Sequence, residues 1–387
     1  MEHFISKIQI EKLRHLKNIE IFLSDNERQH LLLTGKNGSG KTSLLETLSD
    51  CLKAAVMKQK KNPQKIFNSE KFLRKVANNG VKINFNFADD LEKIFADGNF
   101  VLAYFPANRK ANISLAKGVE NVKLSNNYGL SDDPAQNLVK YMVHLKTQQA
   151  YARQENDSRV EIDIKNWFDR FENALKILLE DETIHLEYDY KNYNFLIHQV
   201  GRLPFGFNEL SDGYSSVIQI MAGIMLRMEQ NWLLKGTLSE YNFEGIVLID
   251  ELETHLHIEL QRKILPFLTE FFPRVQFIIS THSPYILTSV SNATIFDLEK
   301  KVTFNDFSKY SIDNVAEAYF DSEDYSVKLE QKLAEYKSLI EKTNPTEEER
   351  IRRAELRSEF KNINGTLSAR IKNEFEDIEA RRKNGQN

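Results

Sequence analysis

The sequence predicts an α/β protein whose core is a parallel β-sheet flanked by helices. Across residues 184–320, short apolar stretches typical of buried strands alternate with segments of helical spacing. A strand followed by a helix and a second strand favours parallel pairing. In addition, the glycine-rich segment GKNGSGKT, residues 35–42, joins a short buried strand to a helix, as phosphate-binding loops of such proteins do.

Residues 1–110 are predicted to hold the first strands and the first helix of this core. The two earliest strands alternate apolar with polar residues, as half-buried strands do. The helix is predicted where apolar residues recur at helical spacing after the glycine-rich segment. The expected strands are 5–10, 18–23, 30–35, 81–87 and 100–105, and the expected helix is 41–57.

Residues 111–183 are predicted to form a helical insertion, and residues 184–320 to complete the sheet. In the insertion, one helical face carries Trp167, Phe168, Phe171, Leu175 and Leu178. The later part is expected to contain a hairpin at 184–200 turning at Asn192, a helix after Gly213, strands at 245–250 and 275–280, and a helix near 258–272. The strand 275–280 is expected to lie beside the strand 245–250.

Residues 321–387 are predicted to form a helical tail for packing or partner binding. Two apolar stripes have helical spacing: Leu329, Leu333, Tyr336 and Ile340, then Leu367, Ile371, Phe375 and Ile378. Between them NPTEEE, residues 344–349, predicts a helix start with Asn344 as the cap, Pro345 in the first turn and Glu347 completing a capping box. The apolar faces are expected to pack on the core or on another chain.

Composition and charge exclude several classes of protein. Hydrophobic residues make up 41% and charged residues 28% of the chain, and no apolar run reaches the roughly 18–20 residues of a membrane span. Cys51 is the single cysteine, which excludes an intrachain disulfide, and the N-terminus lacks a secretory signal pattern. We therefore expect a cytoplasmic protein with no membrane contact. The net charge of −4 leaves open whether the basic run 58–75 is a solvated face or contacts nucleic-acid phosphates.

The segment GKNGSGKT has the pattern of a P-loop that binds the phosphates of ATP. Its glycines, Gly35, Gly38 and Gly40, allow backbone N–H groups to curl around phosphates at the N-terminus of a helix. Lys41 is predicted to reach the β- and γ-phosphates, and the Thr42 hydroxyl to bind Mg²⁺. The predicted nucleotide-binding residues of this segment are Asn37, Gly38, Ser39, Gly40, Lys41, Thr42 and Ser43.

Two later strands end in residues suited to ATP hydrolysis. GIVLIDE, residues 245–251, delivers Asp250 and Glu251 to the carboxyl end of a buried strand, where α/β sheets bind ligands. We expect Asp250 to bind Mg²⁺ and Glu251 to polarise the attacking water. In VQFIISTHSP, residues 275–284, another buried strand ends at His282, which is predicted to contact the γ-phosphate.

The segment LSDG, residues 210–213, predicts a second anion site far along the chain from the P-loop. The Ser211 hydroxyl, the Gly213 N–H and the N-terminus of the following helix can all bind an anion, with Asp212 between them. The simplest explanation is that this segment binds the γ-phosphate held by the P-loop of another copy. ATP would then lie between two copies of the chain in a two-fold dimer.

In this order, GKNGSGKT, LSDG, LIDELE and STHSP resemble the motifs of ABC/SMC-type ATPases. Within that group residues 1–300 resemble the OLD-family and PtuA-like anti-phage defence ATPases. The resemblance implies an ATPase head with an antiparallel β subdomain beside the parallel sheet, ATP and Mg²⁺ as ligands, and a nucleotide contact for Arg14. Two features depart from the family: YFPANRK, residues 104–110, has Asn108 and Arg109 but no glutamine, and the tail lacks the acids of a Toprim nuclease.

Three functions follow from these motifs. The first is an ATP-hydrolysing dimeric switch of an anti-phage defence complex, which controls a separately encoded effector, expected to be a nuclease. The alternative is a DNA repair or maintenance ATPase that binds DNA directly, favoured by the run 58–75. The third is an RNase in the tail, with candidate groups Glu349, Arg350, Arg352 and Arg353, whose helical spacing equally fits surface ion pairs. The sequence leaves open a higher oligomer and the effector's identity.

Overall fold

The computed structural model divides the chain into two compact units, residues 1–309 and 310–387. It describes residues 2–56, 80–87, 91–110, 112–122, 124–125, 128–229, 243–305, 307–309, 315, 332–340, 342, 346–362, 375 and 378–379. The basic run 58–75 lies outside the described residues. No helix in the described part of the chain is long and apolar enough to cross a membrane.

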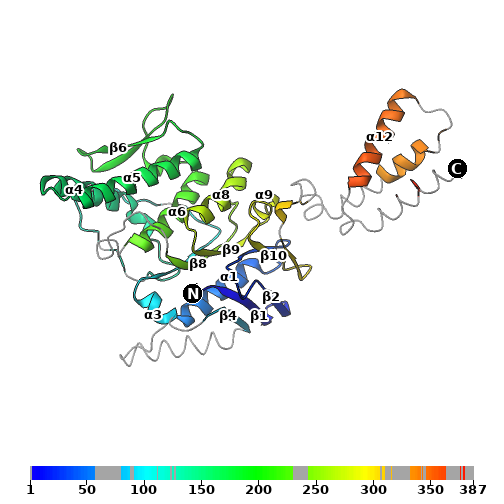
Figure 1. Ribbon diagram of the computed structural model, residues 1–387, viewed down its shortest axis with the longest axis horizontal. Coiled ribbons are helices and arrows are strands. Elements are labelled where there is room, and N and C mark those ends of the chain that lie inside the picture. Colours follow the sequence, from blue (N-terminus) through cyan, green and yellow to red (C-terminus); the bar gives the residue numbers. More distant parts are fainter. Residues whose placement is uncertain are drawn as a thin grey trace. The chain divides into compact units, whose positions relative to one another are not determined.

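A six-stranded sheet forms the centre of the first unit (Figure 1). Its order is β11 (Val302–Asn305), β10 (Ala293–Asp297), β3 (His30–Thr34), β9 (Val275–Ser280), β8 (Glu244–Ile249) and β5 (Phe100–Phe105). Only β11 is antiparallel to its neighbour, and the other pairs are parallel. The predicted α/β class is therefore confirmed. β9 pairs with β8, as predicted. All six residues of β9 are buried, which fits its mainly apolar sequence.

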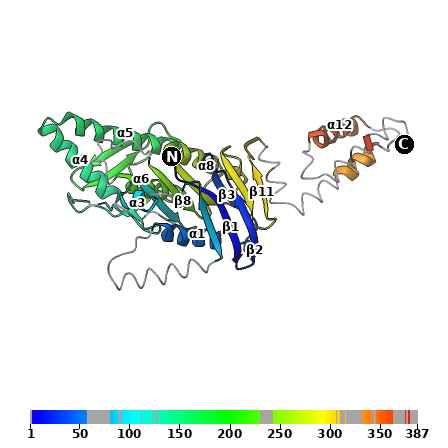
Figure 2. The same ribbon diagram turned by 60° about the horizontal axis from the view of Figure 1, so that its bottom comes forward.

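A three-stranded antiparallel sheet lies beside this core (Figure 2), in the order β2 (Leu16–Phe22), β1 (Ile5–Leu13) and β4 (Val81–Phe85). The alternation in β1 turns Ile8 and Ile10 inward, and both are fully buried. Helix α1 (Lys41–Ala55) contacts β4 on one side and β8 and β9 on the other. The main hydrophobic core is therefore built around the helix that follows the P-loop.

Further helices cover the opposite face of the six-stranded sheet (Figure 1). They are α6 (Asp212–Met228) and α8 (Ile258–Phe271), and the short helices α3 (Leu91–Ala96) and α9 (Pro284–Leu287) complete the core. Arg227 near the end of α6 is buried and donates to the carbonyl oxygens of Leu102 at 3.1 Å and Gly223 at 2.8 Å. Burial lowers the pKa of this guanidinium to about 10, which leaves it charged at neutral pH. α6 is thus tied to strand β5.

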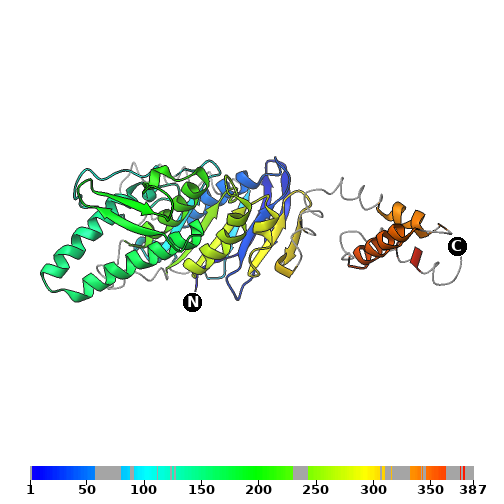
Figure 3. The same cartoon turned by 90° about the horizontal axis from the view of Figure 1, so that it is seen from above.

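The predicted helical insertion is a pair of long helices, α4 (Leu138–Gln154) and α5 (Ser158–Leu179), side by side (Figure 3). The five apolar residues predicted to share a face of α5 are all buried. Trp167 donates its indole N–H to Glu229 at 2.6 Å, and the Tyr141 hydroxyl donates to the same carboxylate at 3.2 Å. The predicted hairpin follows as β6 (His185–Asp189) and β7 (Asn194–His198), with Asn192 in its turn.

The second unit has a small core of its own. Leu333, Tyr336 and Leu339 pack against Leu356 and Phe360, together with Phe375. These described apolar residues cover one another, whereas Leu329, Leu367 and Ile371 of the two predicted stripes lie outside the described residues. That the apolar faces also pack on the core or on another chain stays a prediction. The Tyr336 hydroxyl donates to Glu379 at 2.6 Å inside this core.

A helix begins in the second unit where the sequence predicted one, but its cap and capping-box residues lie later in the chain than predicted. Helix α12 spans Glu347–Asn362. Thr346 caps this helix: the Thr346 hydroxyl accepts from the Glu349 N–H at 3.3 Å, and the Glu349 carboxylate accepts from the Thr346 N–H at 3.0 Å. Asn344 and Pro345, predicted as the cap and first-turn residues, lie outside the described residues. Glu349 rather than Glu347 thus completes the capping box.

Candidate nucleotide site

The P-loop connects the carboxyl end of β3 to the first turn of α1. Gly35, Gly38 and Gly40 all have positive φ, at 130°, 83° and 101°, a region that only glycine adopts readily. Asn37, Gly38 and Thr42 are exposed, whereas Ser39 and Ser43 are buried. No atom of the described chain lies within 4 Å of a Cβ built on Gly38. The loop is therefore open to a ligand at its centre.

Lys41 is buried beneath this loop. Its ammonium donates to the carbonyl oxygens of Gly35 at 2.8 Å and Lys36 at 3.2 Å. Burial lowers its pKa, and the carboxylates of Glu251, Glu253 and Asp250 act in the opposite direction. The acids at the end of β8 are thus close enough to Lys41 to interact with it electrostatically.

The turn between β1 and β2 packs on the P-loop, which the sequence did not reveal. A ring nitrogen of His15 lies 3.1 Å from the Ser39 carbonyl oxygen. A Cβ on Gly40 would lie 3.1 Å from Leu16, so the loop also needs its glycine for close packing here. Arg14, the predicted nucleotide contact, is exposed in the same turn with φ of 53°. Arg14 therefore lies in the turn that packs on the P-loop, but no hydrogen bond or ion pair among the described residues joins its side chain to the loop.

The acidic residues lie at the carboxyl end of β8, one strand away from β3. Asp250 is buried, and one of its carboxylate oxygens accepts the hydroxyl of Ser280 from β9. The same hydroxyl accepts the Glu251 N–H at 2.8 Å. Glu251 has a left-handed φ of 46°, which turns the chain sharply after the strand. Ser280, the last residue of β9, thus fixes both acids and was not among the predicted site residues.

Arg109 lies in the segment YFPANRK, just after strand β5. It is buried, and its guanidinium donates to the carbonyl oxygens of Asp250 at 2.7 Å, Glu251 at 3.0 Å and Leu252 at 3.0 Å. Burial lowers its pKa to about 10, so it keeps its charge at neutral pH. Asn108 is exposed. Arg109 therefore holds the backbone of the acidic turn.

His282 follows β9, between the P-loop strand and the acidic strand. Its main-chain N–H donates to the carboxylate of Glu253. Burial and the charge of Lys41 lower the pKa of its imidazole, which favours the neutral form at pH 7. Its Nε2 is buried and has no hydrogen-bond partner among the described residues. A buried ring nitrogen without a partner is suited to a ligand that enters the site.

The residues fit Mg²⁺ in the manner of nucleotide sites rather than of a protein-only metal site. The described residues contain no group of three acids, histidines or cysteines that could hold a metal by themselves. Mg²⁺ in such sites takes few protein ligands and completes its shell with phosphates and water. The exposed Thr42 hydroxyl and the Asp250 carboxylate are the residues that would hold it.

The segment 210–213 leads into the first turn of α6, and its residues Ser211 and Gly213 line a separate cavity of about 300 Å³. Ser211 is the N-cap of α6, but its exposed hydroxyl makes no capping hydrogen bond. Asp212 forms an ion pair with Lys110 at 2.6 Å. Gly213 packs against the turn after β8, where an added Cβ would lie 2.5 Å from the His255 carbonyl oxygen. The cavity is lined by Glu180, Ser211, Gly213, Tyr214, His255, His257, Glu259 and Leu260.

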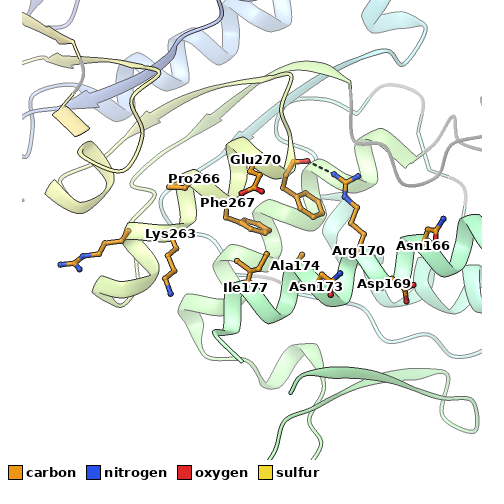
Figure 4. Close-up of a pocket in the computed structure, with 12 residues that line it drawn as sticks. Asn166, Asp169, Arg170, Asn173, Ala174, Ile177, Lys263, Pro266, Phe267 and Glu270 are labelled. Atoms are coloured by element: carbon orange, nitrogen blue, oxygen red, sulfur yellow. Dashed lines mark hydrogen bonds between the residues drawn. The ribbon is translucent and has the colours of Figure 1, made fainter. Parts of the chain in front are cut away.

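A larger cavity of about 670 Å³ lies between α5 and α8 (Figure 4). Asn166, Asp169 and Arg170 lie on one side, and Pro266 and Phe267 on the other. The Arg170 guanidinium donates to the carbonyl oxygen of Phe271 at 3.3 Å. None of the site residues predicted from the sequence lines this cavity.

Known proteins resemble the chain at these motifs. The family model described as "AAA domain, putative AbiEii toxin, Type IV TA system" matches residues 31–288. A Septu protein PtuA of Bacillus mycoides (strain KBAB4) is 26% identical over 304 residues, which cover 76% of this chain but only 40% of that protein. A retron Vc95 probable ATPase of Vibrio cholerae serotype O1 biovar El Tor is 26% identical over 444 residues, with 87% of this chain and 86% of that protein covered. Among solved structures, the SMC head bound to the C-winged helix domain of ScpA has a TM-score of 0.41 and 11% identity, covering 80% of this chain and all of that chain.

Proposed function

The chain belongs to the family described as "AAA domain, putative AbiEii toxin, Type IV TA system", and from this premise we propose that it is an ATPase acting as a dimeric switch in an anti-phage defence complex. The observation that carries the ATPase activity is the convergence of Lys41, Asp250 and His282 at the carboxyl ends of three adjacent strands. Ligands of parallel α/β sheets bind at this edge.

Each residue of the site has a role that its surroundings support. The P-loop amides and Lys41 bind the β- and γ-phosphates. Glu251 polarises the attacking water, and His282, in its neutral form, donates from Nε2 to a γ-phosphate oxygen. Mg²⁺, held by Thr42 and Asp250, neutralises phosphate charge when it is bound. Arg109 keeps the backbone carbonyls of the acidic turn in place.

The active form in this proposal is a homodimer with ATP between the two copies. Ser211 has a free hydroxyl at the N-terminus of a 17-residue helix, which attracts an anion. In the described structure, no P-loop residue lines the cavity beside Ser211. A phosphate held by a second copy can reach the segment 211–213, which explains why this chain has two anion sites.

The role in defence rests on the relatives. One is named a Septu protein PtuA and another a retron ATPase, and the motifs resemble PtuA-like anti-phage ATPases. Because the described residues offer no metal cluster of a nuclease, we propose that the switch controls a separately encoded effector, expected to be a nuclease.

The activity is tested with two substitutions that act at different steps. Lys41→Ala is expected to abolish ATP binding, and Glu251→Gln to bind ATP but hydrolyse it about 10²–10⁴-fold more slowly, because it removes a general base. Isothermal titration and phosphate release measure the two effects. Unchanged ATP affinity of Lys41→Ala would refute the P-loop assignment.

The partner is tested by purifying tagged Glu251→Gln protein from its host with ATP and Mg²⁺, with Lys41→Ala as the matched control. A stoichiometric protein retained only by the first variant supports the switch. Nucleic acid retained without a protein, and lost at high salt, would instead indicate a DNA-binding ATPase.

A further inference from the structure

Glu253 has one carboxylate oxygen in use and one that is not. Its Oε1 accepts the main-chain N–H of His282. Its Oε2 is buried and has no hydrogen-bond partner among the described residues. A buried carboxylate oxygen without a donor is costly, so such an atom in a functional site indicates a missing ligand.

The surroundings place this carboxylate among the functional groups. Among the carboxylates, Glu253 has the strongest effect in raising the pKa of both Arg109 and His282, ahead of Asp250 and Glu251. The hydrogen bonds of the Lys41 ammonium go to the carbonyl oxygens of the P-loop, and those of the Arg109 guanidinium to carbonyl oxygens beside the acidic turn. The Arg109 Nε is also buried without a partner, but it forms no hydrogen bond to Glu253 in this structure. A donor that arrives with the substrate can satisfy the unpaired Oε2.

The chemistry of the site decides which donor this is. A phosphate oxygen of ATP is itself a negatively charged acceptor, so it cannot satisfy a carboxylate oxygen. A water molecule can donate one O–H to Glu253 and its second O–H to another carboxylate. Glu251, two residues earlier in the turn after β8, carries such a carboxylate, whose Oε2 accepts the Thr254 hydroxyl at 3.4 Å.

We propose that Glu253 is a further catalytic residue, which fixes the main chain of His282 with one oxygen and orients the attacking water with the other. This inference rests on the ATPase activity proposed above. In the reaction, the water oxygen forms a bond to the γ-phosphorus while the bond from that phosphorus to the β–γ bridging oxygen breaks. ADP leaves with the electron pair. One water proton passes to Glu251 and then to the released phosphate. No covalent bond of Glu253 forms or breaks.

Glu253→Gln separates the two proposed roles of this side chain, which are to accept the His282 N–H and to orient the attacking water. The glutamine Oε1 can still accept the His282 N–H, but its NH₂ group turns the second position from an acceptor into a donor. We expect kcat to fall about ten- to a hundred-fold, the range of one hydrogen bond to a charged group. Glu253→Ala removes both duties, so we also expect faster hydrogen exchange of the His282 amide in that variant alone.

A measurement without turnover distinguishes catalysis from folding. Orthovanadate with ADP mimics the transition state, in which the attacking water is engaged, whereas adenylyl imidodiphosphate mimics bound ATP. Glu253→Gln is expected to lose affinity for ADP with vanadate and to keep its affinity for adenylyl imidodiphosphate. Glu155→Gln, which changes an exposed glutamate at the end of α4, is the matched control and should leave both unchanged.

The outcomes separate this inference from the proposed function. Wild-type kcat in Glu253→Gln, or equal weakening of both analogues, would overturn the water-orienting role while Lys41-dependent hydrolysis stands. If the wild-type protein shows no hydrolysis that depends on Lys41, the proposed function fails first, and the inference fails with it.

Discussion

At the scale of the residue, the site depends on side chains that hold backbone as much as on side chains that meet ATP. Arg109 binds three successive carbonyl oxygens, those of residues 250–252, and Ser280 binds both Asp250 and the Glu251 N–H. The turn they hold contains the left-handed Glu251, a conformation that costs free energy unless its surroundings fix it. The acid is therefore placed by two neighbours that contribute no chemistry of their own.

Arg109→Lys tests whether Arg109 holds the acidic turn, because lysine keeps the positive charge but lacks the planar guanidinium with its several N–H donors. A single ammonium cannot reach all three carbonyl oxygens, so we expect the free energy of unfolding to fall by about 1–3 kcal/mol and hydrolysis to slow. Urea unfolding and phosphate release measure these effects. Arg153→Lys, in an exposed ion pair with Glu161, is the control and should change neither. Equal behaviour of the two variants would contradict the role of Arg109.

At the scale of the element, the sequence predicted most of the strands and helices that position the site. Apolar runs located β3, β8 and β9 because strands of a parallel sheet are buried on both faces and are therefore mainly apolar. β10 and β11 were missed, although β10 extends the sheet beside β3. Their sequences, ATIFD and VTFN, are short and partly polar, so only pairing with neighbours shows that they are strands.

Contacts between distant segments could not be predicted in the same way. His15, Ser280 and Arg109 carry no motif that marks them, and each acts through a backbone group far along the chain. The sequence pattern predicted Asn344 as the cap and Glu347 as its partner, whereas the geometry identifies Thr346 and Glu349 as the reciprocal pair. Local patterns thus define elements, while the site depends on how those elements meet.

Gly213→Ala tests how closely two elements must meet. Alanine favours a helix over glycine by about 1 kcal/mol, so propensity alone predicts a stabilised α6. The added Cβ would lie 2.5 Å from the His255 carbonyl oxygen, which forces the start of α6 away from the turn after β8. We expect lower thermal stability and at least a tenfold loss of hydrolysis although the backbone N–H remains. Gly118→Ala, with open space around it, is the control; a Gly213→Ala protein as active as this control would show that the contact is dispensable.

At the scale of the whole molecule, one chain carries two candidate anion-binding segments that do not line the same cavity. The P-loop, Asp250 and His282 gather at the carboxyl edge of the sheet, while Ser211 faces a cavity lined by α5, α6 and α8 residues and the turn before α8. The proposed two-fold dimer would bring these two segments together, because each copy then supplies what the other needs. In that proposal, hydrolysis is a property of the pair.

Mixing two inactive variants tests that arrangement directly. Lys41→Ala inactivates the P-loop, and Ser211→Arg blocks the segment before α6 with a bulky side chain. In a mixed dimer, one composite site combines both defects, but the other combines an intact P-loop with an intact Ser211. Random exchange makes half of the dimers mixed, each with one intact site of two, so we expect up to about a quarter of wild-type hydrolysis. Refolding or co-expressing the variants in equal amounts and measuring phosphate release checks this.

Each variant mixed with itself is the control. If the mixture stays as inactive as its components while wild-type protein treated identically recovers, Ser211 serves its own copy or none, and the ATP sandwich must be abandoned.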